Sequence, residues 1–360
     1  MLHHSHWLLH AFHRGDRKMS GRFPERFTSV AELEGFLSLP SEGLVSFVKA
    51  LEGDIMIVGA GGKIGPTMAR MAKRAVDEAG VSKTVYAVDV VELASLASEG
   101  IETIQCDMLD QDAVASLPSV RNIVYMVGRK FGSTGSESLT WAINDIVAYH
   151  AARAFQGSRI AAFSTGCVYP VVHMNTGGAT EDTPPAPVGE YAMSCLGRER
   201  MFDFFADSGK EDVVHIRLNY AVECRYGVLF DIASAVWSGE PVDLTTGYAN
   251  VIWQGDACNQ ILQALSQAAS PAGILNVTGP EMFSIRTVAK RFGALMDREP
   301  VFKGEENGYG YLSDATRANG LFGNPSVPLA RIIEWTAQWL MSGGENLGKP
   351  THFETQDGKY

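Results

Sequence analysis

Positive charge and long hydrophobic runs are both scarce in this chain of 360 residues. It has 30 lysines and arginines against 41 aspartates and glutamates, so its net charge at pH 7 is −11. That balance offers no electrostatic footprint for nucleic acid or for an anionic membrane surface. No apolar run approaches the roughly 18 residues that a transmembrane helix needs. We therefore predict a protein without nucleic-acid or membrane partners, and we expect it to be cytoplasmic.

Cysteine and histidine do not have the spacing of structural sites. The five cysteines are odd in number and form no C-x-x-C pair, which favours reduced thiols over a disulfide framework. Five of the nine histidines fall within "MLHHSHWLLHAFH" at the start of the chain. We interpret residues 1–20 as a disordered His-rich extension, outside the fold. The other four histidines are scattered, so we predict no catalytic metal site.

Two short helices are expected before the main domain. Ser29 and Glu32 have the spacing of a capping box, and Ser41 can cap a second helix. They define an N-terminal helical preamble over residues 21–52.

Alternation of strands and helices follows. The stretch "DIMIVGAGGKIGPTMARMAKRA" has an apolar run, a glycine cluster and then helical spacing, and five further strand-like runs end with "VVHIRLNYA". This order predicts an α/β fold, a Rossmann-like doubly wound parallel sheet with a smaller C-terminal α/β substrate-binding lobe. The predicted units are a Rossmann-like domain over 53–220 with strands returning around 244–262, a lobe mainly over 221–345, and a tail over 346–360.

The glycine cluster predicts a dinucleotide site. Gly59, Gly62 and Gly65 have the spacing G-x-x-G-x-x-G, and Lys63 and Ile64 lie inside the same turn. Glycines allow a tight turn and close approach of the backbone to a pyrophosphate at the helix N-terminus. Asp89 ends the second strand, where a carboxylate can accept hydrogen bonds from an adenosine ribose and would repel a 2′-phosphate. The predicted cofactor is therefore NAD.

These residues resemble the extended short-chain dehydrogenase/reductase family, in its NAD-dependent epimerase/dehydratase group. The resemblance covers roughly residues 54–341. It rests on the glycine pattern, on an Asp with an apolar residue after it in "CDMLD", on "FSTGCVYP", and on a partial Tyr-x-x-x-Lys in "YAMSC". It implies cofactor contacts from Asp107 and Met108, a catalytic hydroxyl from Thr165, an acid/base role for Tyr191, a small-molecule substrate and a homodimer.

One departure concerns the lysine of that motif, because Cys195 stands in its place. A tyrosine has a pKa of about 10, and a nearby cation is normally needed to favour its phenolate. Arg198 lies on nearly the same helical face and can supply a fixed charge, whereas Lys130, after the fourth strand, can supply charge and relay a proton. Each also has an ordinary interpretation, as a paired helix residue or a surface loop lysine.

The substrate prediction rests on a second departure. The arginine that pairs a nucleotide diphosphate in relatives acting on sugar nucleotides aligns with Ala249. We therefore predict an NAD-dependent oxidoreductase or epimerase acting on a carbohydrate-like alcohol, such as a free sugar, sugar acid or polyol, with Asn219 facing it. The alternatives are a nucleotide-sugar epimerase or dehydratase and a non-catalytic NAD-binding sensor.

Overall fold

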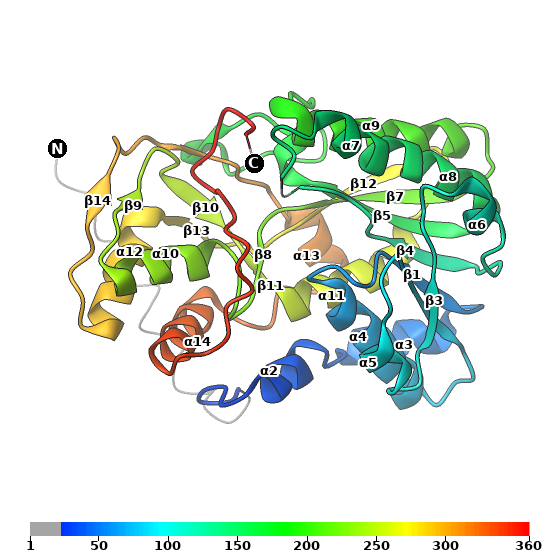
Figure 1. Ribbon diagram of the computed structural model, residues 1–360, viewed down its shortest axis with the longest axis horizontal. Helices are drawn as coiled ribbons and strands as arrows, with labels where there is room; N and C mark the ends of the chain where they lie inside the picture. The colour runs from blue at the N-terminus through cyan, green and yellow to red at the C-terminus, as the bar shows by residue number, and fades with distance from the viewer. Residues whose placement is uncertain (1–22, 131, 360) are drawn as a thin grey trace.

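A computed structural model describes residues 23–130 and 132–359 (Figure 1). The predicted His-rich extension therefore lies outside the described residues. The strands of the large sheet are β1 Ile55–Val58, β2 Val85–Asp89, β3 Glu102–Gln105, β4 Asn122–Tyr125, β5 Arg159–Thr165, β7 Asp212–Leu218 and β12 Gly273–Val277. The helices around it are α3 Glu42–Ala50, α4 Gly65–Ala79, α5 Ala94–Ala97, α6 Gln111–Ala115, α7 Glu137–Trp141, η1 Ala142–Ile146, α8 Val147–Ala154, α9 Gly189–Ala206, α11 Gln254–Ala264 and α13 Thr316–Phe322.

The large sheet has seven parallel strands in the order β12-β7-β5-β4-β1-β2-β3. Strand β1 lies between β2 and β4. The later strands are added outward from it, β2 and β3 on one side and β4, β5, β7 and β12 on the other. This is the predicted doubly wound α/β fold. Its carboxyl-terminal edge at this switch point is where such folds bind ligands.

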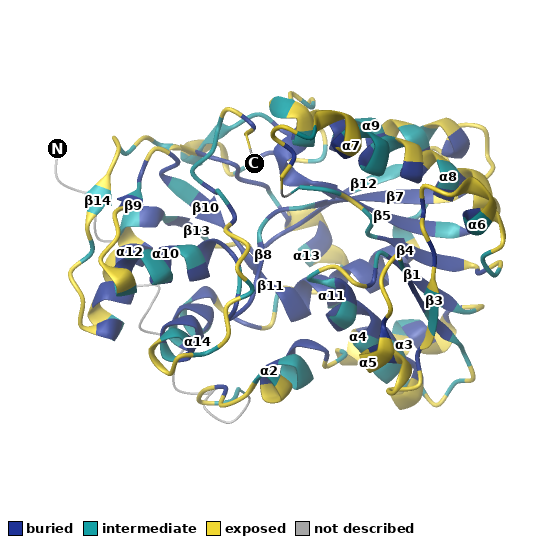
Figure 2. Cartoon of the chain, in the orientation of Figure 1, coloured by how far each residue is buried: buried dark blue, intermediate teal, exposed yellow. Residues whose placement is uncertain are grey.

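Both faces of the sheet are covered because its strands are apolar on both sides. In β1, Ile55 and Ile57 pack with α3, α4 and α11, whereas Met56 and Val58 pack with α8 and α9. The two helical layers lie below and above the sheet in Figure 1, and Figure 2 shows the central strands between them as buried. Near-continuous apolar strands are typical of parallel sheets for this reason.

A second core forms the smaller lobe. It contains α10 Val228–Ser238, α12 Ile285–Met296 and α14 Leu329–Met341, with their apolar faces buried together. Its short strands form pairs outside the large sheet: β10 Tyr248–Asn250 with β13 Met282–Ser284, β9 Val242–Asp243 with β14 Phe302–Lys303, β11 Ile252–Trp253 with β8 Ala221–Val222, and β15 Tyr309–Gly310 with β6 Val172–His173.

The predicted return of strands around residues 244–262 is wrong. β10 and β11 lie in two-stranded sheets, and the strand that rejoins the large sheet is β12, at residues 273–277. The 254–264 stretch is instead α11, whose buried side covers the large sheet. This stretch is a helix that buries one side on the sheet, and the local periodicity of the sequence does not reveal that burial.

The N-terminal helices α2 Val30–Leu37 and α3 are capped by Ser29 and Ser41, whose side chains accept from Glu32 N–H and Leu44 N–H. In the expected capping box the Glu32 carboxylate would accept from the N–H of Ser29. In the structure it accepts instead from the N–H and the hydroxyl of Thr28. Helix α2 also joins both parts of the molecule.

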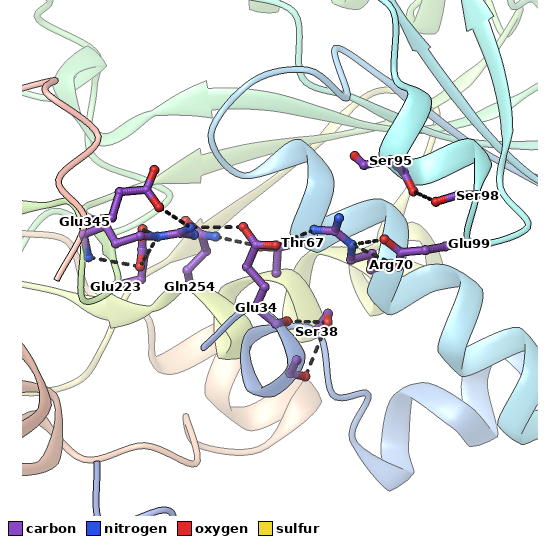
Figure 3. A network of polar contacts seen from close by, with 12 residues as sticks. Glu34, Ser38, Thr67, Arg70, Ser95, Ser98, Glu99, Glu223, Gln254 and Glu345 are labelled. Carbon is purple, nitrogen blue, oxygen red and sulfur yellow. Dashed lines mark hydrogen bonds and ion pairs between the residues drawn. The ribbon is translucent and has the colours of Figure 1, made fainter. Parts of the chain in front are cut away.

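Glu34, on α2, makes that connection. Its carboxylate accepts from Arg70 of α4 at 3.1 Å and from Arg225 of the smaller lobe at 3.0 Å (Figure 3). Within the sheet domain, Gln254 at the start of α11 donates to the Thr67 hydroxyl of α4 at 2.9 Å. The preamble is thus an integral contact between the sheet domain and the lobe.

Candidate active site

Two glycines of the turn between β1 and α4 tolerate no side chain. Gly59 has a φ of +91°, and an added Cβ would lie 2.9 Å from the backbone of the segment after β4. A Cβ on Gly65 would collide with the backbone of Ala60. Gly62 differs, because only the Gly59 carbonyl oxygen, at 3.5 Å, would lie near an added Cβ. The turn therefore brings α4 tightly against the end of β1.

Asp89 ends β2 beside this turn. Its carboxylate accepts from the N–H of Gly61 at 2.8 Å and from the N–H of Val91 at 3.2 Å. The carboxylate thereby shapes the turn, and its two oxygens can still accept further bonds.

Asp107 and Met108 follow β3 on the same edge. Asp107 is exposed and accepts from the N–H of Leu109 at 2.9 Å. The Met108 side chain is buried in the core beneath α8, and its carbonyl oxygen lies 3.3 Å from a ring nitrogen of His150. The aspartate faces solvent, and the methionine side chain contributes to packing.

Tyr191 lies on α9, beside Thr165 at the end of β5. The Thr165 side chain hydrogen-bonds the Tyr191 phenol, and the phenol also hydrogen-bonds the Cys195 thiol one turn later. Burial raises the pKa of Tyr191 well above its usual value, and Cys195 and Cys167 raise it further. The hydrogen bond from Thr165 and the charge of Arg198 act in the opposite direction. Burial also raises the pKa of the Cys195 thiol, to about 11, so the thiol is neutral at pH 7.

Arg198 is a buried, fixed cation. Its Nη1 donates to the Phe163 carbonyl oxygen at 2.9 Å, and its Nη2 donates to Asn144 Oδ1 at 2.6 Å. Its guanidinium lies against Gly128, where any side chain would collide with it. The sequence placed Arg198 on the Tyr191 face of the helix, and the structure holds its charge near that phenol.

Asn144 is a central residue of the site that sequence reasoning missed. It lies in the π-helical segment η1, accepts from the Arg129 N–H at 2.8 Å and donates to the Ser194 hydroxyl at 2.8 Å. With its bond to Arg198 it joins η1, α9 and the segment after β4. π-Helical turns are frequent at functional sites, but the sequence "AINDI" contains no local pattern that predicts one.

Lys130 and Lys63 approach the site from two loops. The Lys130 ammonium lies 5.8 Å from the centre of the Tyr191 ring and donates to the Thr351 carbonyl oxygen at 3.1 Å. Burial lowers the pKa of Lys130. The Lys63 ammonium lies over the ring of Tyr226, and burial together with the charge of Lys130 lowers its pKa to about 6.

Asn219 does not fit the predicted contact with substrate. It is buried, and its amide donates to Asn250 Oδ1 at 2.9 Å and to the Tyr311 carbonyl oxygen at 3.0 Å. Both amide hydrogens are thus used within the protein. Asn219 joins the end of β7 to the smaller lobe.

A buried ion pair lies behind the site. Arg217 of β7 donates to both oxygens of Glu199 on α9, at 2.9 and 2.7 Å, and the Ser164 hydroxyl donates to the same carboxylate. The two charged side chains are 2% and 1% exposed. This pair fixes α9 against β5 and β7, the strands beside Thr165.

Comparison with known families decides the class of protein. Residues 55–222 match the NAD dependent epimerase/dehydratase family. The chain carries an NAD-dependent epimerase/dehydratase domain. Over this range the match confirms the predicted family, the class of enzyme and NAD as the cofactor. The matched range contains the glycine turn, Thr165 and Tyr191 of this domain. No curated protein matches the chain.

Solved structures share the fold of the epimerase/dehydratase domain and its lobe. MoeE5 in complex with UDP-glucose and NAD is 19% identical, with a TM-score of 0.64 over 81% of this chain and 99% of that one. UDP-glucose 4-epimerase from Thermotoga maritima with UDP-glucose is 17% identical, with a TM-score of 0.65 over 81% and 99%. DesIV, a dTDP-glucose 4,6-dehydratase from Streptomyces venezuelae with NAD and TYD bound, is 18% identical, with a TM-score of 0.68 over 80% and 97%.

The residues of the epimerase/dehydratase domain fit NAD. No side chain caps the N-terminus of α4, so the positive end of its dipole is open to a pyrophosphate. Within residues 23–130 and 132–359, no group of three or more His, Cys, Asp or Glu could hold a metal ion. No helix in the described part of the chain is long and apolar enough to cross a membrane.

Proposed function

We propose that the protein is an NAD-dependent oxidoreductase or epimerase that acts on a carbohydrate-like alcohol, with Tyr191 as acid/base. The observation that carries this proposal is that Tyr191 of α9 and Thr165 at the end of β5 lie side by side, with the phenol within hydrogen-bonding reach of the Thr165 side chain. The pair lies at the carboxyl end of β5, on the sheet edge that also bears the glycine turn. A proton-transfer group and a dinucleotide cradle on one edge suit hydride transfer at a carbinol carbon.

The glycine turn and the N-terminus of α4 would hold the pyrophosphate of NAD, and Asp89 would accept hydrogen bonds from the adenosine ribose. NAD, when bound, supplies the hydride acceptor. Tyr191 takes the proton of the substrate hydroxyl, and Thr165 donates a hydrogen bond that steadies the developing charge. Because the pKa of Tyr191 is raised, the phenol is neutral at rest. It must therefore pass on its own proton before it takes that of the substrate hydroxyl, and in the reverse direction it donates this proton to a substrate oxygen.

Two cations compensate for the lysine that Cys195 replaces. Arg198 supplies a permanent positive charge, which favours the phenolate form of Tyr191. Its guanidinium is locked by Phe163 and Asn144 and cannot relay a proton. Lys130 has a pKa lowered by burial, so it can pass a proton as well as supply charge.

A nucleotide-sugar epimerase or dehydratase is the second candidate. Three solved structures of the same fold hold UDP-glucose or TYD, which favours a related ligand here. Arg225 is not available for a diphosphate, because Glu223 and Glu34 engage its guanidinium at 3.0 Å each. This engagement supports the smaller substrate of the first proposal.

The test is NADH formation by the purified protein with NAD and a panel of free sugars, sugar acids, polyols and nucleotide sugars. We expect turnover with a non-nucleotide compound and a loss of about 10²- to 10⁴-fold in Tyr191→Phe, the contribution typical of general acid–base catalysis. Tyr86→Phe is the matched control, because β2 and β5 are separated by two strands of the sheet. NAD binding with no product from any compound, and Tyr191→Phe unchanged, would favour an NAD-binding sensor.

We also propose that the protein is a homodimer through α7, η1, α8 and α9. These elements pack side by side, and their outer surface carries five exposed apolar side chains: Leu139, Ile146, Tyr149, Met193 and Phe204. Phe204 alone is 65% exposed. Exposed apolar side chains on adjoining helices are the kind of surface that a partner covers.

Light scattering after size exclusion tests the dimer. Phe204→Glu with Ile146→Glu should yield a folded monomer, whereas Leu321→Glu on α13, also exposed, should leave the mass unchanged. A wild-type monomer at micromolar concentration contradicts the proposal.

A further inference from the structure

The C-terminal segment, residues 345–359, connects the smaller lobe to the helix of Tyr191. It leaves α14 where the Trp339 indole donates to the Glu345 carbonyl oxygen at 2.9 Å, and it buries Phe353 in the lobe core. It ends beside α9, where the backbones of Gly358 and Gly189 are so close that neither tolerates a side chain. Figure 1 shows this red segment running along the lobe toward α9.

Thr351 is the most firmly held residue of the segment. It is 2% exposed, and one carboxylate oxygen of Asp231, on α10, accepts from its N–H at 2.8 Å and from its hydroxyl. Its carbonyl oxygen accepts from the Lys130 ammonium at 3.1 Å. A chain of contacts therefore runs from α10 through Thr351 to Lys130 and the Tyr191 ring.

We propose that Thr351 is a positioning residue that holds the Lys130 ammonium beside Tyr191. A carbonyl acceptor stabilises the charged form of a lysine that burial would otherwise neutralise. The titratable groups around Lys130 are Cys167, Cys195, Asp231 and Glu354, whose ionised forms favour its cation, and Lys63, which opposes it. Because Thr351 is tied to the smaller lobe, the position of this charge depends on contact between the lobe and the sheet domain. The inference rests on the proposed role of Lys130 at this site.

The first experiment needs no turnover. The full-length protein is treated with an amine-acylating reagent at neutral pH, and the modification rate of each lysine is followed by peptide mass spectrometry. We expect slow modification of Lys130 in the wild type and in Thr351→Ser, and a rate about tenfold higher in Thr351→Val, which loses the hydroxyl bond to Asp231. Lys83 is the internal control, because its ammonium also donates to a backbone carbonyl, that of Leu51, outside the segment. Its rate should stay constant.

Asp231→Asn is the second variant, and it weakens the same anchor while Thr351 is retained. It keeps the proposal testable if Thr351→Val does not fold. Equal Lys130 rates in the wild type and in the folded variants overturn the proposal, whatever the activity.

The pH profile of NADH formation separates the two proposals. Thr351→Val should displace the profile, and Thr351→Ser should restore it, which a purely structural loss would not do. If Lys130 modification responds but no variant forms NADH with any substrate, the positioning role stands and the proposed reaction is wrong.

Discussion

Removing the positive partner of the buried ion pair should destabilise the protein strongly. In Arg217→Met, Glu199 keeps the Ser164 hydroxyl but loses two bonds, at 2.9 and 2.7 Å, inside the protein. Breaking such a buried pair costs about 3–5 kcal/mol, because a charge is left without compensation. The total free energy of unfolding of a domain is about 5–15 kcal/mol, so this loss is a large part of it.

The loss of stability in Arg217→Met should depend on pH through the pKa of Glu199. Burial tends to raise the pKa of Glu199, but hydrogen bonds and charge from Arg217, with the charge of His215, hold it below its usual value. In the wild type the stabilisation is present above the unfolded pKa and is lost as the pH falls through the folded one. In Arg217→Met burial dominates, so the pKa of Glu199 rises. The penalty should then shrink on acidification from pH 8 toward pH 5 as the carboxyl binds a proton.

Urea unfolding followed by circular dichroism measures both effects. The control is Arg200→Ala on the same helix, whose partner is Asp203 at 2.8 Å but whose side chain is 58% exposed. An exposed pair of this kind contributes about 0–1 kcal/mol. Adding Glu199→Leu to Arg217→Met should recover part of the loss, because no buried charge then remains. Equal losses in Arg217→Met and Arg200→Ala, or a penalty that is independent of pH, would refute the reasoning.

Three further outcomes are expected. Gly65→Ala should unfold at a lower urea concentration and lose NAD affinity in titration calorimetry, because its Cβ would collide with the Ala60 backbone. Gly62→Ala has space for a Cβ and should keep its stability. Equal unfolding midpoints of the two variants would contradict this. Burial raises the pKa of Asp145 to about 6, so its contribution to stability is present below about pH 4 and is lost as the pH rises through 6. Asp145→Asn should therefore be more stable than the wild type at pH 8 but not at pH 4, and a constant difference in unfolding midpoint would argue against that. Glu34→Ala should cost about 1 kcal/mol in urea unfolding, because this partly exposed carboxylate bridges two arginines, and no change would mean that the bridge is dispensable.

Residues of the glycine turn could be recognised from sequence because their constraints are local. A short apolar run, glycines at fixed spacing and a helical period define a strand, a tight turn and a helix within about 25 residues. The proximity of Tyr191 and Cys195 was equally readable, since residues four apart lie on one helical face. The fold class followed from the repetition of such units.

Contacts between distant segments had no such signal. Asn144 and Arg198 are 54 residues apart, and Lys130 and Thr351 are 221 apart. Asn219 looked like a substrate contact because it ends a strand at the ligand-binding edge, and only the packed lobe shows that its amide is paired. The return of the chain to the sheet at β12 rather than around 244–262 was missed for the same reason.

Local pattern was therefore enough to specify the α/β class, the glycine turn, the helix of Tyr191 and the missing lysine at Cys195. Tertiary structure alone decided which cations lie near the phenol, which polar side chains are used up in holding the lobes together, and where the C-terminal segment ends. The physical reason is that backbone conformation and amphipathic spacing depend on neighbours in the chain, whereas burial, charge pairing and pKa depend on groups that only folding brings together.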